Sequence, residues 1–561
     1  HALIAAGAMV AAAVLAAVLP GGTGGRAAAL RLWAAPWALA LVLAVSVYRD
    51  HMVMFRFAGA IADGAATLAI AAAALAGWML SARLAARYAP AVSHGVLLGV
   101  AALLVGGSLV RMATSSPPTW EPPADAVTAA EAGPHDETGL RVLVIGVDGG
   151  TWKTLDPLRE AGVMPNLDAL CKRGVTARLQ TDLPTYSPNL WTSIATGKTL
   201  DKHGIPTHVY SRPPLGLPDI AQRPDGIAYL TKVMKYAVRR ADRRGLFTIG
   251  VYGAENLKAR RYWDIAGEFG LPSVTLEWYV THPAEPVLGV EVSDRFHLLE
   301  GEALGRAVFP AELAAELESD IVRQADLEEE VLGFADTEGM SPEEIRGLAD
   351  RHPDIFGTLA HEMARDLTTR NLVGSAFPRI PDWRVGSVYF RAMDGSHHTA
   401  WQHKEAAETG SGDAVDALVP VVDRYTAFCD ELIAAPLALA DSSTVVIMVS
   451  DHGWEDARRA HARKPDGFFV MAGGPVTASA QRTDVSVYDV APTILALLGI
   501  PVPEDMDGRA LTDLFDPAFR DRHPVRTVPS YEHEDRRRSG ADAAADEEFL
   551  EQLRALGYVG P

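Results

Sequence analysis

Acidic and imidazole side chains recur just beyond continuous apolar runs of this 561-residue sequence. The runs are Arg141–Val147, Val385–Phe390 and Thr444–Ser450, and each has the pattern of a strand that is buried on both faces. The polar residues that follow them are Asp148, Asp394, His398, Asp451, His452 and, nine residues beyond His452, His461. Carboxylates mixed with neutral imidazoles suit Zn²⁺, with Mn²⁺ as the harder alternative.

A hydroxyl that could attack phosphorus lies in the segment PTYSPNLWTS. Ser187 precedes Pro188, so we expect Ser187 to be the N-cap of a helix and Pro188 its first residue. A serine there lies at the positive end of a helix dipole, beside backbone N–H groups that can bind a phosphate oxygen. Thr185 is a weaker candidate. Seven side chains, counting one hydroxyl, suffice for two metal ions that clamp the attacking and leaving oxygens of phosphoryl transfer.

Strand and helix patterns alternate through most of residues 140–515. Further predicted strands are Phe247–Tyr252, Ser273–Trp278 and Gly467–Ala472, and predicted helices include Met164–Arg173, Ala414–Ala434 and Tyr488–Leu498. This alternation predicts an α/β fold with a mostly parallel central sheet sandwiched by helices. Because the carboxyl ends of parallel strands meet at one edge of such a sheet, we expect the candidate ligands to lie close together.

The first 110 residues differ in composition from the rest. They hold six Arg and two Asp, a net charge of +4, whereas the whole chain carries −20 and residues 111–561 therefore carry −24. Four apolar stretches, each near the ~20 residues that cross a bilayer, predict an all-α transmembrane block: roughly Ala2–Pro20, Leu32–Tyr48, Phe57–Leu80 and Ser93–Val110. The arginines between them favour, by a narrow margin, an integral membrane protein with an extracytoplasmic catalytic domain.

The remaining boundaries follow from composition. Residues 111–139 are rich in Pro and acid and predict a linker, residues 140–515 a catalytic domain with an insertion at about 206–384, and residues 516–561 a tail. Within the insertion, the acidic stretch Pro310–Arg370 predicts a solvated helical cap. The acidic balance disfavours nucleic-acid binding, and two cysteines, Cys171 and Cys429, exclude a disulfide scaffold and a Cys-rich zinc module.

Several segments together resemble the type I phosphodiesterase/nucleotide pyrophosphatase branch of the alkaline phosphatase superfamily. They are VIGVDGGTW (Val144–Trp152), MPNLDALCKRGV (Met164–Val175), PTYSPNLWTSIATGKTLDKHGI (Pro184–Ile205), FRAMDGSHH (Phe390–His398), VSDHGW (Val449–Trp454), HARKPDGFFVMAGGP (His461–Pro475) and DVAPTILALLGIPVPEDMDGRAL (Asp489–Leu511). Neither cysteine begins the C-x-P-x-R motif of the superfamily's sulfatases, so a sulfatase is not expected.

The resemblance implies a role for each candidate residue. By position, the first metal would be held by Asp148, Ser187, Asp451 and His452, and the second by Asp394, His398 and His461. Ser187 takes the nucleophile position, where family members often have Thr. The family's phosphate-binding Asn would fall on Leu190, one position after Asn189, so phosphate contact by Asn189 is doubtful. We expect His203 and His397 to be structural.

These observations predict a membrane-anchored, two-metal phosphoesterase that acts through a phosphoserine intermediate. Its expected cofactors are two divalent ions, Zn²⁺ or Mn²⁺, and its expected partners are a phosphate-ester substrate and the lipid bilayer. No nucleic-acid binding is expected, and no protein partner follows from the sequence. Two alternatives remain open: a transferase of phosphorylated lipid headgroups, and a non-enzymatic membrane scaffold. The sequence does not distinguish a monoester from a diester substrate.

Overall fold

The computed structural model describes residues 121–182, 185–212, 220–221, 248–391, 393–410, 414–455 and 465–533, with Asp546, Phe549, Leu550 and Leu553. The chain forms two compact units, His1–Thr119 with Ser211–Thr248, and Trp120–Tyr210 with Ile249–Pro561. Nearly all described residues belong to the second unit. The four predicted membrane spans lie outside the described residues. Of the helices that are described, none is both long and apolar enough to cross a bilayer.

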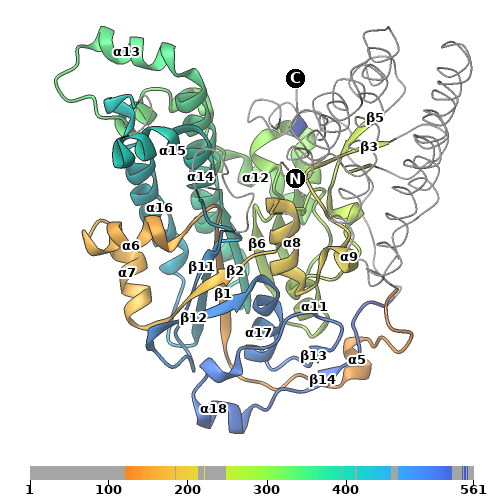
Figure 1. Ribbon diagram of the computed structural model, residues 1–561. Helices are drawn as coiled ribbons and strands as arrows, with labels where there is room; N and C mark the ends of the chain where they lie inside the picture. The colour runs from red at the N-terminus through yellow and green to blue at the C-terminus, as the bar shows by residue number, and fades with distance from the viewer. Residues whose placement is uncertain are drawn as a thin grey trace, which may run out of the picture. The chain divides into compact units, whose positions relative to one another are not determined.

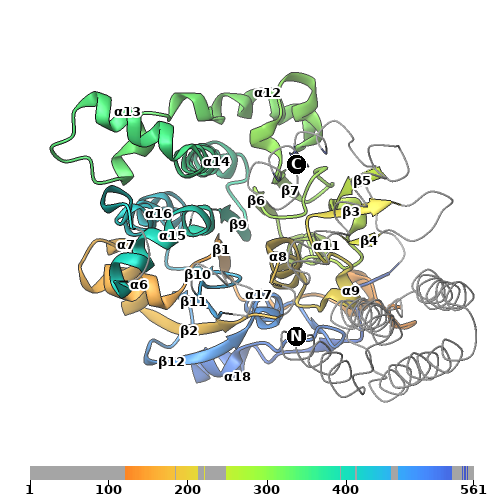
Figure 2. The ribbon, with the colours of Figure 1, turned by 45° about the horizontal axis from the view of Figure 1, so that its top comes forward.

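In the second unit, the described residues form a nine-stranded sheet in the order β12-β2-β11-β10-β1-β9-β6-β7-β8 (Figures 1 and 2). The strands are β1 (Arg141–Val147), β2 (Gly174–Gln180), β6 (Ser273–Leu276), β7 (Gly289–Val292), β8 (Val308–Phe309), β9 (Val385–Phe390), β10 (Thr444–Val449), β11 (Gly467–Ala472) and β12 (Ser479–Ser486). The five strands from β10 to β7 run parallel. β11 is antiparallel to both of its neighbours, and β8 to β7. The predicted α/β fold with a mostly parallel centre is therefore confirmed for this unit.

Two layers of helices cover the sheet. One face packs against α6 (Trp152–Glu160), α7 (Pro165–Lys172), α14 (Pro353–Ala376), α15 (Met393–Thr409) and α16 (Val421–Leu437). The other face packs against α8 (Ser187–Thr196), α11 (Tyr262–Glu268) and α17 (Val490–Leu497). β1 serves both cores, because its side chains alternate: Leu143 and Ile145 join the first layer, and Val142 and Val144 the second.

The bounds of the strands were easier to predict than the strands with which they pair. β1, β9 and β11 have the predicted bounds. The predicted strand Phe247–Tyr252 is not part of the central sheet: β5 (Thr248–Val251) instead lies beside β3 (Val209–Arg212) in a smaller sheet. The apolar run was real, but a run carries no information about the strand with which it pairs. β2, β7 and β12 were not predicted.

Helix bounds shifted where a proline intervened. The helix predicted at Ala414–Ala434 begins only at Val421, after Pro420. Proline has no backbone N–H and cannot donate the hydrogen bond that would extend a preceding helix through it. Residues Asp416–Leu418 form a separate 3₁₀ turn before it. The other two predictions lie closer to the structure: α7 spans Pro165–Lys172 and α17 spans Val490–Leu497.

The stretch predicted to be a solvated cap is only partly solvated. α13 (Pro342–Arg351) is largely exposed, but α14 carries three polar residues that are at most 1% exposed, Glu362, Arg365 and Asp366. Their charged character suggested a solvent-facing surface. In the structure they contact other buried charged residues, Arg391 and Glu277, as described below.

The segment that precedes β1 makes several hydrogen bonds to the C-terminal part of the chain. The backbone N–H of Val127 donates to Ser530 O at 2.8 Å, and that of Asp136 donates to Gly499 O at 2.9 Å. The Thr138 hydroxyl donates to Leu497 O at 2.8 Å.

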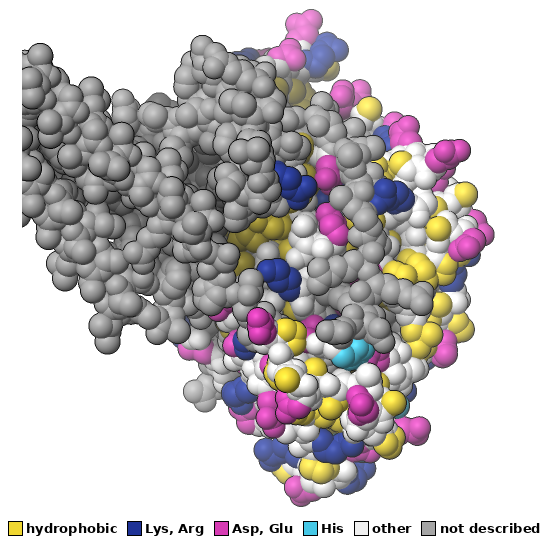
Figure 3. All heavy atoms as spheres, turned by 90° about the vertical axis from the view of Figure 1, so that its right-hand side faces the viewer, with side chains coloured by type: hydrophobic (Ala, Val, Ile, Leu, Met, Phe, Trp, Pro, Cys, Tyr) yellow, Lys and Arg dark blue, Asp and Glu magenta, His cyan; other side chains and the backbone are white. Residues whose placement is uncertain are grey.

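On the face shown in Figure 3, acidic side chains of the described residues are interspersed with basic ones. The described surface on this side thus mixes both signs of charge.

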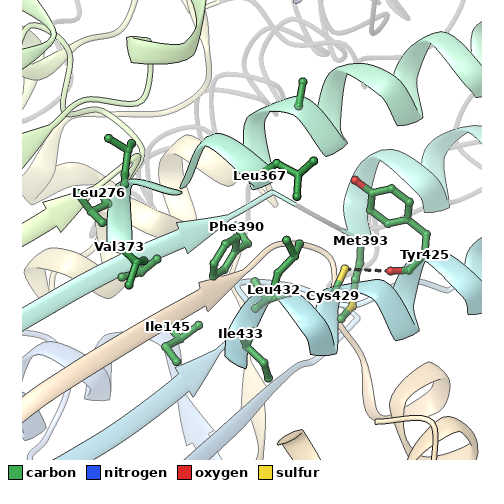
Figure 4. Close-up of a cluster of buried hydrophobic side chains, with 14 of the residues drawn as sticks. Ile145, Leu276, Leu367, Val373, Phe390, Met393, Tyr425, Cys429, Leu432 and Ile433 are labelled. Atoms are coloured by element: carbon green, nitrogen blue, oxygen red, sulfur yellow. Dashed lines mark hydrogen bonds between the residues drawn. The ribbon is translucent and has the colours of Figure 1, made fainter. Parts of the chain in front are cut away.

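The core beneath α14 and α16 is apolar and closely packed. Figure 4 shows Ile145 and Phe390 of the sheet together with Leu432 and Ile433 of α16. All four side chains are at most 1% exposed. The Cys429 thiol donates to Tyr425 O within α16, as expected of a buried packing residue.

We expect Leu432→Ala to lower the free energy of unfolding by about 2–5 kcal/mol, because it removes buried methyl groups and leaves a cavity. Urea unfolding followed by circular dichroism measures this loss. Glu431→Ala, at the exposed neighbouring position of the same helix, is the matched control and should change stability by less than about 0.5 kcal/mol. Equal effects of the two substitutions would contradict the packing shown here.

Candidate active site

Three ligand-type side chains converge at the carboxyl ends of adjacent strands. Asp148 directly follows β1, Asp394 lies in the first turn of α15 after β9, and His452 follows β10. One ligand atom from each lies within 4.8 Å of the other two. All three residues are buried, at 0–1% exposure. Because β10, β1 and β9 are parallel neighbours, the sheet itself brings these residues together.

Two further candidates border this group. Asp451 Oδ2 lies 3.7 Å from His452 Nε2, which also lies 3.5 Å from Asp148 Oδ1 and 4.0 Å from Asp394 Oδ1. His398 Nε2 lies 3.4 Å from Asp394 Oδ2, and the His398 side chain is 32% exposed. The structure therefore brings five of the predicted side chains into one neighbourhood. His461 lies outside the described residues, and its role stays a prediction.

Asp148 is held by one oxygen and presents the other. Its Oδ2 accepts hydrogen bonds from Tyr389 OH at 2.5 Å and from Trp191 Nε1 at 3.1 Å. Its Oδ1 faces His452 and has no hydrogen-bond partner among the described residues. A carboxylate that is oriented in this way by outer partners is typical of a metal ligand.

The electrostatics of the group call for a cation. Burial raises the pKa of Asp451 well above its ordinary value, and the neighbouring charges of Asp148 and Asp394 raise it further. Three carboxylates crowded around one imidazole repel one another in a medium of low polarity. A divalent cation would compensate them, so the residues present fit a metal site of carboxylate and imidazole ligands.

Close backbone contact fixes the spacing of two ligands. Gly149 has a φ of +73°, and a Cβ placed on it would lie 2.8 Å from Asp394 Cα. A side chain at this position would therefore meet both the left-handed backbone and the ligand-bearing turn. Gly149 thus allows the turns after β1 and β9 to approach each other.

Ser187 is the first residue of α8, one position later in the capping pattern than predicted. The N-cap is Tyr186, so Pro188 lies at the second helical position and the Ser187 hydroxyl does not cap the helix. Residues four apart share one helix face, and Trp191, four residues after Ser187, contacts Asp148. Ser187 therefore lies on the face of α8 that is turned toward Asp148, and it is only 5% exposed.

The two histidines that were expected to be structural are buried. His203 ends α9 (Leu200–His203), with its Nε2 3.1 Å from Ser193 Oγ. His397 packs against the rings of Trp401 and Trp454, whose centroids lie 5.0 and 5.5 Å away. Sequence reasoning missed Tyr389 and Trp191 as anchors of Asp148. The spacing of Trp191 from Ser187 was a usable signal, whereas nothing in the sequence singles out Tyr389.

A comparison with protein families agrees with this geometry. The model of the family described as "Type I phosphodiesterase / nucleotide pyrophosphatase" matches residues 142–498, well over half of the chain. The chain belongs to this family. The matched range includes Asp148, Ser187, Asp394 and His452.

One curated relative matches a short part of this chain. A curated relative, the 2,3-bisphosphoglycerate-independent phosphoglycerate mutase of Thermomicrobium roseum, is 32% identical over 114 residues. That match covers 18% of this chain and 21% of the relative, so the chain matches about a fifth of that protein's length.

Solved structures show a remote likeness. A protein of Bacteroides thetaiotaomicron described as a sulfatase has a TM-score of 0.38 at 12% identity, with 67% of this chain and 74% of that chain covered. A multiply substituted variant of the alkaline phosphatase PafA has a TM-score of 0.39 at 11% identity, with 66% and 98% covered.

We expect Zn²⁺ or Mn²⁺ to stabilise the folded chain, because only the folded state assembles the buried ligands. At about 100 times the dissociation constant, the gain is about 2.7 kcal/mol. Thermal unfolding with added metal, compared with unfolding in EDTA, measures it. Asp148→Asn should abolish most of the metal-dependent shift, whereas Asp484→Asn, at an exposed ion pair with Arg178, should retain it. A shift that persists in Asp148→Asn would place the metal elsewhere.

His203 should make the fold sensitive to acid. Burial lowers the pKa of His203 to about 3. Between pH 6.5 and pH 3 the unfolded chain takes up a proton here that the folded chain does not, so stability falls as the pH falls, by up to about 1.4 kcal/mol per pH unit. In His203→Gln this contribution is absent, and stability should fall less steeply between pH 6 and pH 4.5 in urea unfolding. Identical slopes would mean that His203 protonates normally in the folded chain.

Proposed function

We propose that this chain is a metal-dependent phosphoesterase of the phosphodiesterase type, with Ser187 as its nucleophile. The observation that carries the proposal is the buried group of Asp148, Asp394 and His452, whose ligand atoms lie within 4.8 Å of one another. The orientation of α8 adds to it, because Trp191 joins the helix that bears Ser187 to Asp148. Membership of the phosphodiesterase family agrees with both.

The proposed metal set extends the described group. Asp148, Asp451 and His452 would hold one ion beside Ser187, and Asp394 and His398, with His461, would hold a second. When bound, such ions would activate the serine oxygen and neutralise charge that develops on the phosphoryl group. Zn²⁺ suits the mixture of carboxylates and imidazoles, and Mn²⁺ is the alternative.

Ser187 would carry the covalent step. Its Oγ forms a bond to phosphorus while the bond from phosphorus to the leaving oxygen breaks. A monoester gives a phosphoserine, whereas a diester gives a seryl phosphodiester that keeps the second alcohol on phosphorus. The serine gives up its proton, and the leaving oxygen takes one up. Water then forms a bond to phosphorus, the bond from phosphorus to Oγ breaks, and Ser187 takes back a proton. The start of α8 supports this role, since the N-terminus of a helix carries a positive partial charge that favours a phosphoryl oxygen.

We further propose that the chain is anchored in a membrane with its catalytic domain outside the cytoplasm. The four apolar stretches of the first 110 residues and the arginines between them support this part of the proposal. A water-soluble or lipid-bound phosphate ester is compatible with this arrangement.

Ser187→Ala should lower turnover by at least about 10³-fold, because the covalent intermediate can no longer form. The assay is hydrolysis of bis-p-nitrophenyl phosphate and of p-nitrophenyl phosphate by the full chain loaded with metal. A diesterase should hydrolyse the first compound faster. Elemental analysis should show that the variant retains most of its metal, since the two carboxylates and the imidazole of the described group remain.

Ser193→Ala is the matched control on the same helix. Ser193 donates to Asn189 O at 3.0 Å and contacts His203, so its loss should perturb packing and change turnover by less than about threefold. An active Ser187→Ala enzyme would exclude Ser187 as the nucleophile. A full chain that is inactive on both esters despite bound metal would favour the scaffold alternative.

A further inference from the structure

A buried charged face of α14 lies against the turn that carries Asp394. Glu362, Arg365 and Asp366 stand three and four residues apart, so they share one face of the helix. All three are at most 1% exposed. Charged side chains are rarely buried to this degree unless they are paired. Because these charged side chains are buried, they do not serve to keep the surface soluble, and their network must have another role.

Two of these residues hold Arg391, the first residue after β9. The backbone N–H of Arg391 donates to Asp366 Oδ1 at 2.9 Å, and its guanidinium Nε lies 3.2 Å from Glu362 Oε1. Arg391 itself is 2% exposed and stands three residues before Asp394. The start of the turn is thus fixed through both its backbone and its side chain.

The same helix also contacts the chain on the other side of Asp394. A Cβ placed on Gly395 would lie 2.7 Å from Glu362 Cγ and 3.3 Å from Thr358 Cγ2. Glu362 therefore touches the residue that follows Asp394, while it pairs with the arginine that precedes Asp394. The backbone around Asp394 is held by α14 from both directions.

The network continues to the end of the next strand. Arg365 Nε lies 3.1 Å from Glu277 Oε2, and Glu277 directly follows β6 with a φ of +57°. A residue other than glycine in this left-handed region is strained, and such strain persists only where surrounding contacts enforce it. One face of α14 thus fixes the ends of both β9 and β6.

Stability alone is a poor reason for this arrangement. Burying an ion pair costs desolvation energy that its attraction barely recovers, and a well-packed apolar substitute is often as stable. An apolar side chain cannot accept a hydrogen bond from the Arg391 N–H. An apolar contact would therefore not fix the backbone position beside the proposed metal ligand as precisely.

We propose that Asp366 and Glu362 are positioning residues that hold the start of α15, which bears Asp394 in its first turn and His398 in its second, and thereby set the metal affinity of the site. This inference rests on the metal site of the proposed function. It assigns no contact between these two residues and the substrate. Their effect would reach the metal through the described neighbours of Asp394 that they contact, Arg391 and Gly395.

The test is the affinity of the purified full chain for Zn²⁺, measured by competition with a chromophoric chelator. Asp366→Ala should weaken binding by up to about 10–100-fold, the effect of losing a group that bonds a ligand directly, because Asp366 acts through the backbone of Arg391. Asp366→Asn should bind within about threefold of the unsubstituted chain, because its amide oxygen can still accept the Arg391 N–H. This measurement needs no turnover, so it stands even if Ser187 is not the nucleophile.

Asp430→Ala is the matched control. Asp430 is also a buried carboxylate that accepts backbone hydrogen bonds, from Asn166 N at 2.9 Å and Leu167 N at 2.8 Å, but it fixes the start of α7. Its loss should lower the melting temperature and leave Zn²⁺ affinity unchanged. If Asp366→Ala lowers the melting temperature in the same way with unchanged affinity, Asp366 is merely structural and the inference fails.

Glu362→Gln covers the case in which Asp366→Ala does not fold. It keeps the shape of the side chain and removes the charge that pairs with Arg391, so Zn²⁺ binding should weaken several-fold. Unchanged affinity in Glu362→Gln would remove Glu362 from the proposal. Failure of Asp366→Asn to restore binding in a folded chain would exclude the Arg391 N–H as the means by which Asp366 acts.

Discussion

Mutual repulsion among buried carboxylates is the constraint around which this structure is built. Asp148, Asp394 and Asp451 meet at adjacent strand ends with His452 among them, and all four are at most 1% exposed. Without a compensating cation, such a group would have to take up protons to remain folded. The surrounding structure must therefore hold these acidic side chains close together, which explains the contacts that support Asp148 and the turn bearing Asp394.

Those supports come from different parts of the fold. Asp148 is oriented by Tyr389 from the neighbouring strand and by Trp191 from α8. The turn that carries Asp394 is held by α14. Parallel strand ends bring the ligands near one another, but side chains from separate helices determine how each carboxylate faces the site. The active-site neighbourhood thus depends on both helical layers at once.

Much of this arrangement could be predicted from sequence, because strand ends in a parallel sheet must meet. The runs before Asp148, Asp394 and Asp451 are continuous and apolar, so each could be predicted as a buried strand. Predicting the strands also predicted where the polar residues that follow them lie. Less accessible were features that depend on a partner far along the chain. β5 belongs to a different sheet, because the residues of a strand do not indicate the strand with which it pairs. Glu362 and Asp366 led to the prediction of a solvated helix, because charged residues are usually exposed. The sequence does not reveal the distant partners with which they are buried.

The hydrogen bond between Trp191 and Asp148 has an optical consequence. The indole N–H is shared with a carboxylate of the metal group, and the ring also stands edge-on to Trp278 and Tyr389, at centroid distances of 5.2 and 4.9 Å. Any change of charge on that carboxylate alters the field across the indole at contact distance. The emission wavelength of Trp191, one of eleven tryptophans in the chain, is therefore expected to respond to a change of charge on Asp148.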